Sequence, residues 1–191
     1  MGNAAWAEAW LALSGALRLA RGDRGGLACF DRSLDGFWRS FRAAAVTYPL
    51  YLVLLTMRVS VAEWQRSGGW RIVLVETIGY VIAWVAFPLV MLAVTRWIGR
   101  AHRFFEFMVP YNWSQIPQSA LFVLVGTATE SRILGARAGE SLDIVAALAT
   151  LAYEWYIARV ALDTPGSTAV FVILVDLVLG VFISRIAAGL Y

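Results

Sequence analysis

Hydrophobic positions form long apolar runs separated by short polar segments, and this pattern begins near residue 43. Four runs have the composition of membrane-spanning helices: Ala43–Met57, Arg71–Arg96, Ile144–Leu162 and Gly166–Leu190. A hydrocarbon core about 30 Å thick needs about 20 helical residues, so the first run is short unless the arginines that flank it reach the interface. A fifth apolar run lies in the middle of the chain. The pattern therefore predicts an all-α, polytopic membrane helix bundle with five transmembrane segments in residues 43–191.

The middle of the chain, Phe107–Gln118, reads FMVPYNWSQIPQ and is polar and flanked by prolines. Ser114 has the chemistry of a helix N-cap, and Pro117 would then stand at the third helical position, where its missing N–H is not needed. The third span is expected at Gln115–Thr129, about 22 Å long at the helical rise. Because this length is too short, residues 108–113 are predicted to enter the membrane as a non-helical or kinked stretch, tolerated only where protein or a polar cavity satisfies its backbone.

Residues 1–42 are amphipathic. A helix over residues 3–20 would place Trp6 and Trp10 on the same face as two leucines, and a second helix would carry large apolar side chains opposite the arginines Arg39 and Arg42. The apolar positions of the second helix are Phe30, Leu34, Phe37, Trp38 and Phe41. We expect both helices to lie on an anionic membrane surface, and packing against the bundle is the alternative.

Composition and charge agree with a membrane protein. The hydrophobic fraction is 60% and the charged fraction 15%, against roughly 25% charged residues in soluble domains. All 16 basic residues are arginine, which suggests a GC-rich bacterial genome. With five spans and the N-terminus inside, the inner face collects ten of these arginines and the outer face six, which favours a cytoplasmic N-terminus in the bacterial inner membrane. Lipids with anionic headgroups, rather than nucleic acid, are the expected partners.

Charged side chains inside spans are costly and therefore mark candidate sites. Glu154 and Asp176 each lie about nine residues from the same short loop, about 13 Å at the helical rise, so they could meet between the last two spans. Arg159 could answer Asp176 from the neighbouring span. Holding helices together and handling ions or protons are both open to these residues.

Neutral polar side chains cluster in the central segment, namely Tyr111, Asn112, Gln115 and Gln118. They could form a solute site or satisfy the backbone of the predicted break. Near the C-terminus, Gly180, Ser184 and Ala188 form a stripe of small residues suited to close helix contact, within one chain or between copies of it.

Several features are shared with a known family: an amphipathic N-terminal region ending in GFWRSF, a first span with a central proline, YNW at the third span and five spans in all. In these features, residues 27–190 resemble the bacterial relatives of the Yip1 family of polytopic membrane proteins. The resemblance implies a helical, non-enzymatic protein that organises or shapes membrane or accompanies a larger complex.

No catalytic triad, metal-ligand cluster, phosphate loop or cofactor motif is recognisable in the sequence, so we expect neither an enzyme nor a bound metal or cofactor. The first functional hypothesis is a membrane scaffold or accessory subunit, as a homo-oligomer or within a larger complex. The alternative is a small proton-coupled transporter or channel that uses the intramembrane carboxyl groups.

Overall fold

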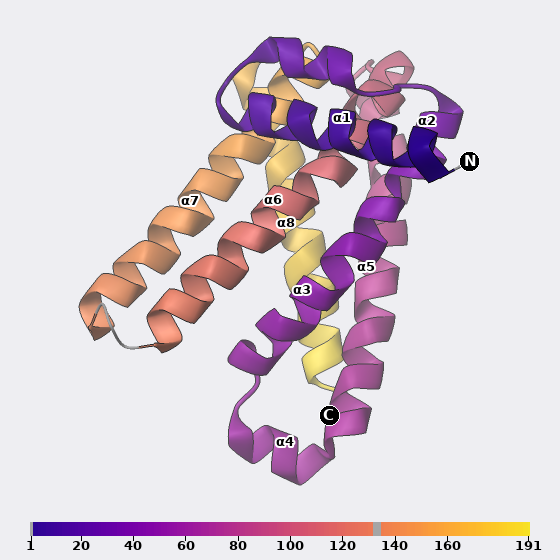
Figure 1. Ribbon diagram of the computed structural model, residues 1–191. Helices are drawn as coiled ribbons and strands as arrows, with labels where there is room; N and C mark the ends of the chain where they lie inside the picture. The colour runs from indigo at the N-terminus through magenta and orange to yellow at the C-terminus, as the bar shows by residue number, and fades with distance from the viewer. Residues whose placement is uncertain (1, 132–134) are drawn as a thin grey trace.

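The computed structural model describes residues 2–131 and 135–191, and every regular element in these residues is a helix (Figure 1). In chain order the elements are α1 (Gly2–Ala20), η1 (Arg24–Cys29), α2 (Leu34–Ser40), α3 (Arg42–Arg58), α4 (Val61–Ser67), α5 (Gly69–Trp97), η2 (Ala101–Arg103), α6 (Phe104–Glu130), α7 (Ala136–Ala161) and α8 (Gly166–Ala188). The predicted all-α fold is confirmed.

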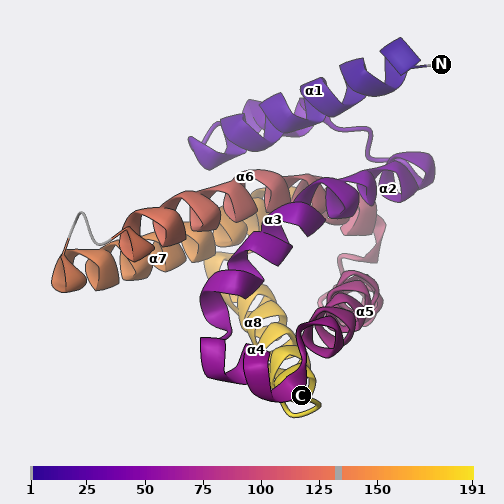
Figure 2. The same cartoon turned by 60° about the horizontal axis from the view of Figure 1, so that its bottom comes forward.

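The helices form a bundle with a cap at one end. Figure 1 shows α1 and α2 lying across the end where the N-terminus is found, called here the α1 end, while α3, α5, α6, α7 and α8 run away from it. The C-terminus and the short helix α4 lie at the opposite end, called the α4 end. Figure 2 shows α6 and α7 side by side, diverging from α5 and α8.

Four segments are long and apolar enough to cross a membrane: Leu34–Arg58, Gly69–Trp97, Ala136–Ala161 and Gly166–Ala188. These segments overlap the four apolar runs found in the sequence, although Leu34–Arg58 and Ala136–Ala161 begin well before the runs that they match. The protein is therefore a multi-pass helical membrane protein. Helix α6 is as long as the others but is not among the four, and it carries more polar side chains.

The predicted break in the middle of the chain is wrong, because α6 continues through Pro110 and Pro117 from Phe104 to Glu130. Each proline removes one backbone donor and costs about 3 kcal/mol inside a helix. Packing outweighs this cost, since all the side chains from Phe107 to Ser114 are buried. Helix α6 contacts α1, α2, α3, α5 and α7, and these helices enclose the stretch. A helix that is enclosed in this way has no single apolar face.

Two segments outside the predicted spans are helical. Helix α7 begins at Ala136, although the fourth span was predicted to begin only at Ile144; residues 132–134 lie outside the described part. Alanine, arginine, glutamate and leucine in this segment are good helix formers, which its glycine and charge content obscured. Helix α4 begins with a capping box. The backbone N–H of Glu63 donates to the Ser60 hydroxyl, and the backbone N–H of Ser60 donates to the Glu63 carboxylate.

The N-terminal region departs from two simple amphipathic helices. Helix α1 packs on α6 through its small face, with Ala12 and Ala16 buried, and leaves Trp6 and Trp10 71% and 69% exposed. The second predicted helix is only the seven-residue α2, which Ser33 caps. Its expected face is divided: Phe30 and Phe37 are buried, Phe41 is half-buried, and Leu34 and Trp38 are exposed, because the chain enters the bundle at this point.

Candidate functional site

Glu154 and Asp176 lie together in the interior of the bundle. Asp176 on α8 accepts a hydrogen bond of 2.6 Å from the hydroxyl of Tyr111 on α6. Glu154 on α7 is buried and lies near both Asp176 and Gln115. Three helices thus bring four of the predicted residues to one place, which we call the acid pair site.

A cavity of about 110 Å³ adjoins the acid pair site. Asp176, Tyr111 and Gln115 line its polar side, and Trp84 and Phe87 of α5 line its apolar side. One water needs about 10–15 Å³ measured in this way, so several waters or a small polar solute fit beside the Asp176 carboxyl group.

The other polar residues of α6 have structural contacts. Asn112, which also lines the cavity, donates to the Ser40 hydroxyl at 2.8 Å and so ties α6 to α2. Gln118 donates to the Ser114 hydroxyl at 3.0 Å, and Ser114 donates in turn to the Tyr111 carbonyl. Asn112 therefore bonds to a neighbouring helix and Gln118 to its own helix, both through serine hydroxyls rather than through the backbone of a break.

Arg159 does not reach Asp176. Its side chain is exposed and its guanidinium lies 5.2 Å from the centroid of the Trp155 ring on the same helix, a cation–π contact. The hypothesis of an Arg159–Asp176 pair across α7 and α8 is wrong, because the helical rotation from Glu154 to Arg159 carries the arginine to the outer face of α7.

A second buried carboxylate, Glu76 on α5, was overlooked in the sequence. It is 2% exposed and forms an ion pair of 2.8 Å with Arg58 of α3. The hydroxyls of Tyr51 and Tyr191 donate to the same carboxylate, Tyr191 at 2.7 Å. We call these four residues the Glu76 cluster. A lone acid in an apolar run was the available signal, the same signal that singled out Glu154.

Three residues of the Glu76 cluster line a cavity of about 170 Å³, together with Tyr80 and Ser184. The three are Tyr51, Arg58 and Glu76. Arg58 also donates to the Ser184 hydroxyl at 3.4 Å. Ala83, Gly180 and Ile183 line both this cavity and the one beside the acid pair site. The two buried acidic regions are thus separated only by this shared wall between α5 and α8.

The predicted stripe of small residues on α8 is not the surface that packs against α5, and contact between copies through it stays a prediction. Helix α8 contacts α5 through Ile183 and Ala187, whose carbons lie 3.8 and 3.6 Å from the place where a Cβ on Gly79 would stand. Gly180 faces open space, Ser184 contacts Arg58, and Ala188 is exposed. The residues of α8 that contact α5, Ile183 and Ala187, each stand one position before a residue of the stripe. The close approach of the two helices is made possible by Gly79 of α5.

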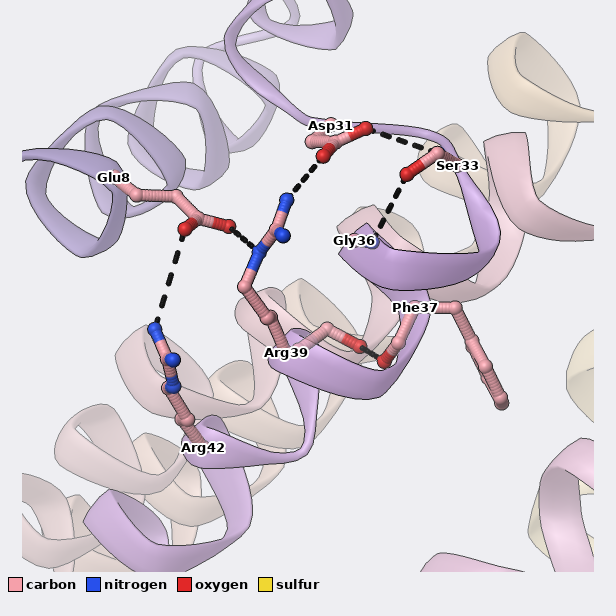
Figure 3. Close-up of polar contacts among 8 residues, drawn as sticks. Glu8, Asp31, Ser33, Gly36, Phe37, Arg39 and Arg42 are labelled. Atoms are coloured by element: carbon pink, nitrogen blue, oxygen red, sulfur yellow. Dashed lines mark hydrogen bonds and ion pairs between the residues drawn. The ribbon is translucent and has the colours of Figure 1, made fainter. Parts of the chain in front are cut away.

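At the α1 end, a polar network holds α1 on the bundle (Figure 3). Arg39 donates to Glu8 at 2.7 Å and pairs with Asp31, and Arg42 lies 4.0 Å from the other Glu8 oxygen. Hydrogen bonds from Ser33, together with the charge of Arg39, lower the pKa of Asp31 below its ordinary value. The two arginines expected to face anionic lipid are therefore partly neutralised within the protein.

The fold and these contacts define a multi-pass membrane protein with buried acids among its helices. No protein-family model matches the chain, and neither the curated proteins nor the solved structures contain a match. The resemblance to Yip1-like proteins stays a prediction. Within residues 2–131 and 135–191, no three His, Cys, Asp or Glu side chains are grouped closely enough to hold a metal ion.

Proposed function

We propose that the protein is a five-span carrier of the bacterial inner membrane that couples the movement of protons to that of a small polar solute. In this proposal α6 is the fifth span and the N-terminus is cytoplasmic. The length of α6 supports its assignment as a span, and so does the burial of its polar side chains against protein rather than lipid.

The observation that carries the proposal is the cavity beside Tyr111 and Asp176, with Glu154 behind it. Two neighbouring carboxyl groups in a medium of low dielectric constant do not both ionise cheaply, so the acid pair would retain a proton that it can release. Tyr111 stabilises the charged form of Asp176 through its hydroxyl. Solute entering the cavity would compete with that proton for Asp176, which is the coupling that a proton-driven carrier needs.

Proton flux into proteoliposomes tests this function directly. Glu154→Gln and Asp176→Asn should each reduce proton uptake by about a hundredfold or more, as loss of a proton-transferring group does elsewhere. Glu140→Gln is the matched control, because Glu140 is an exposed carboxylate on α7 that lines none of the cavities described above. Flux equal to that of the unmodified protein in both variants would remove the acid pair from the mechanism.

A second candidate is a non-enzymatic scaffold or accessory subunit that lies on anionic lipid through its N-terminal region. It is supported by three exposed tryptophans at the α1 end, Trp6, Trp10 and Trp38, the last 64% exposed. Large aromatic side chains beside arginines suit an anionic interface.

Native mass spectrometry of protein in gentle detergent distinguishes this role. The scaffold predicts an oligomer, a co-purifying subunit or retained phosphatidylglycerol, and loss of the retained lipid in the Trp6→Ser, Trp10→Ser, Trp38→Ser variant. A strictly monomeric protein that retains neither partner nor lipid would count against the scaffold and leave the carrier unaffected.

A further inference from the structure

We infer that the Glu76 cluster is the entrance to the acid pair site from the α4 end and that it selects positively charged solutes. This inference rests on the proposed carrier function, because it supplies the route by which a solute reaches Asp176. Its support comes from three cavities that share their walls and from the position of one ion pair between them.

The first step concerns where the ion pair lies. Glu76 is almost completely buried on α5, whereas the side chain of its partner Arg58 is 48% exposed. The pair therefore joins the interior of the bundle to its surface near the end of α3. Breaking it would require only Arg58 to move, because Glu76 is also held by Tyr51 and Tyr191.

The second step concerns what lies on each side. Outside the cluster is a cavity of about 470 Å³ that Arg58 and Tyr51 also line. Inside it is the cavity of about 170 Å³, which shares the wall at Gly180 with the cavity beside Asp176. Arg58 and Tyr51 thus line both the 470 Å³ cavity and the 170 Å³ cavity, which is the position that a barrier between these two cavities requires.

The third step concerns charge. Glu130 and Asp143 line the outer cavity, and each is exposed there. Together with Glu76 and Asp176 they place acidic groups along the whole series of cavities, and Arg58 is the basic residue among the lining side chains. Such a series attracts small cations and repels anions, and Arg58 determines how strongly it does so.

Gly180 offers a reporter position that reads access without transport. Gly180 lines both inner cavities and is itself exposed on α8, a transmembrane segment whose outer surface lipid would cover in a nanodisc. A Cβ there would have no atom within 4 Å, so Gly180→Cys fits without strain. The native cysteine is replaced in this background by Cys29→Ser. Protein in lipid nanodiscs is then treated with the membrane-impermeant thiol reagents MTSET, which is cationic, and MTSES, which is anionic.

Labelling should be slow with both reagents while the ion pair is intact. Arg58→Gln should raise the rate with MTSET about tenfold over that with MTSES, since it leaves the acids without their counter-ion. Glu76→Gln should reverse this preference, because it leaves Arg58 uncompensated. The double variant should admit both reagents faster and keep a smaller preference for MTSET, because Glu130, Asp143 and Asp176 remain. Tyr191→Phe should raise both rates modestly without changing their ratio.

A merely structural ion pair would change both labelling rates together, so an unchanged MTSET to MTSES ratio in all variants would overturn the entrance. Ser131→Cys, in the same background, is the control for reagent delivery, because Ser131 is exposed at the α4 end outside the cavities. Labelling needs no flux. Normal charge selection without proton uptake would refute the carrier alone, and uptake without charge selection would refute the entrance alone.

Discussion

The Glu76 cluster and the acid pair site accommodate buried carboxyl groups in opposite ways. In the Glu76 cluster, one carboxylate receives a guanidinium and two phenol hydroxyls. In the acid pair site, Asp176 accepts a hydrogen bond from Tyr111 and Glu154 lies near Gln115, and no ion pair to either acid is found among the described side chains. The first arrangement fixes a charge in place, whereas the second leaves protonation free to change.

This difference separates stability from function. A compensated buried charge contributes to a unique arrangement of helices, and removing one partner exposes the full cost of the other. Two acids without counter-ions contribute little to stability, because the repulsion between them ends only when one of them is protonated. We therefore expect the Glu76 cluster to be sensitive to substitution in its stability and the acid pair site in its activity.

The largest effect on stability is expected from Arg58→Gln. It leaves Glu76 buried without a counter-ion, and the free energy of unfolding should fall by about 2 to 3 kcal/mol, below the usual range for buried pairs because Arg58 is half exposed. Reversible unfolding in lipid nanodiscs measures this change. Asp176→Asn is the matched control and should leave stability unchanged or raise it, although it removes proton flux.

Removing both charges sharpens the same comparison. The double variant Arg58→Gln, Glu76→Gln should recover to within about 1 kcal/mol of the unmodified protein, since no charge is left unpaired. Equal losses in the single and double variants would mean that packing of the side chains, rather than their charges, holds this cluster. A large loss in Asp176→Asn would mean that both regions are structural.

Much of the bundle was predictable because its determinants are local. Helices α3, α5 and α8 follow apolar runs whose ends differ from the predicted ones by two residues or fewer. The meeting of Glu154 and Asp176 followed from helical rise and a shared loop, which fix depth in two consecutive helices without any knowledge of distant packing.

The remainder depends on contacts between segments far apart in the chain. Proline chemistry favoured a break in α6, but five elements enclose that segment, and only the assembled bundle shows the enclosure. Glu76 meets Arg58 from α3 and Tyr191 from the C-terminal end. Arg58 and Tyr191 stand 18 and 115 positions from Glu76 in the sequence, and no local pattern links them to it.

The smallest effect is expected at Gly180, which lies between the two regions and belongs to neither. Because a Cβ there meets nothing within 4 Å, Gly180→Ala should leave the free energy of unfolding unchanged or raise it by up to about 1 kcal/mol through reduced backbone freedom. Gly139→Ala is the matched control. Its Cβ would stand 2.8 Å from the Thr129 Cγ2, so α6 and α7 must separate, and a loss of about 1 kcal/mol is expected from overpacking. If Gly180→Ala instead destabilised the protein as Gly139→Ala should, α8 would be packed closely at Gly180, and the two cavities would not connect there.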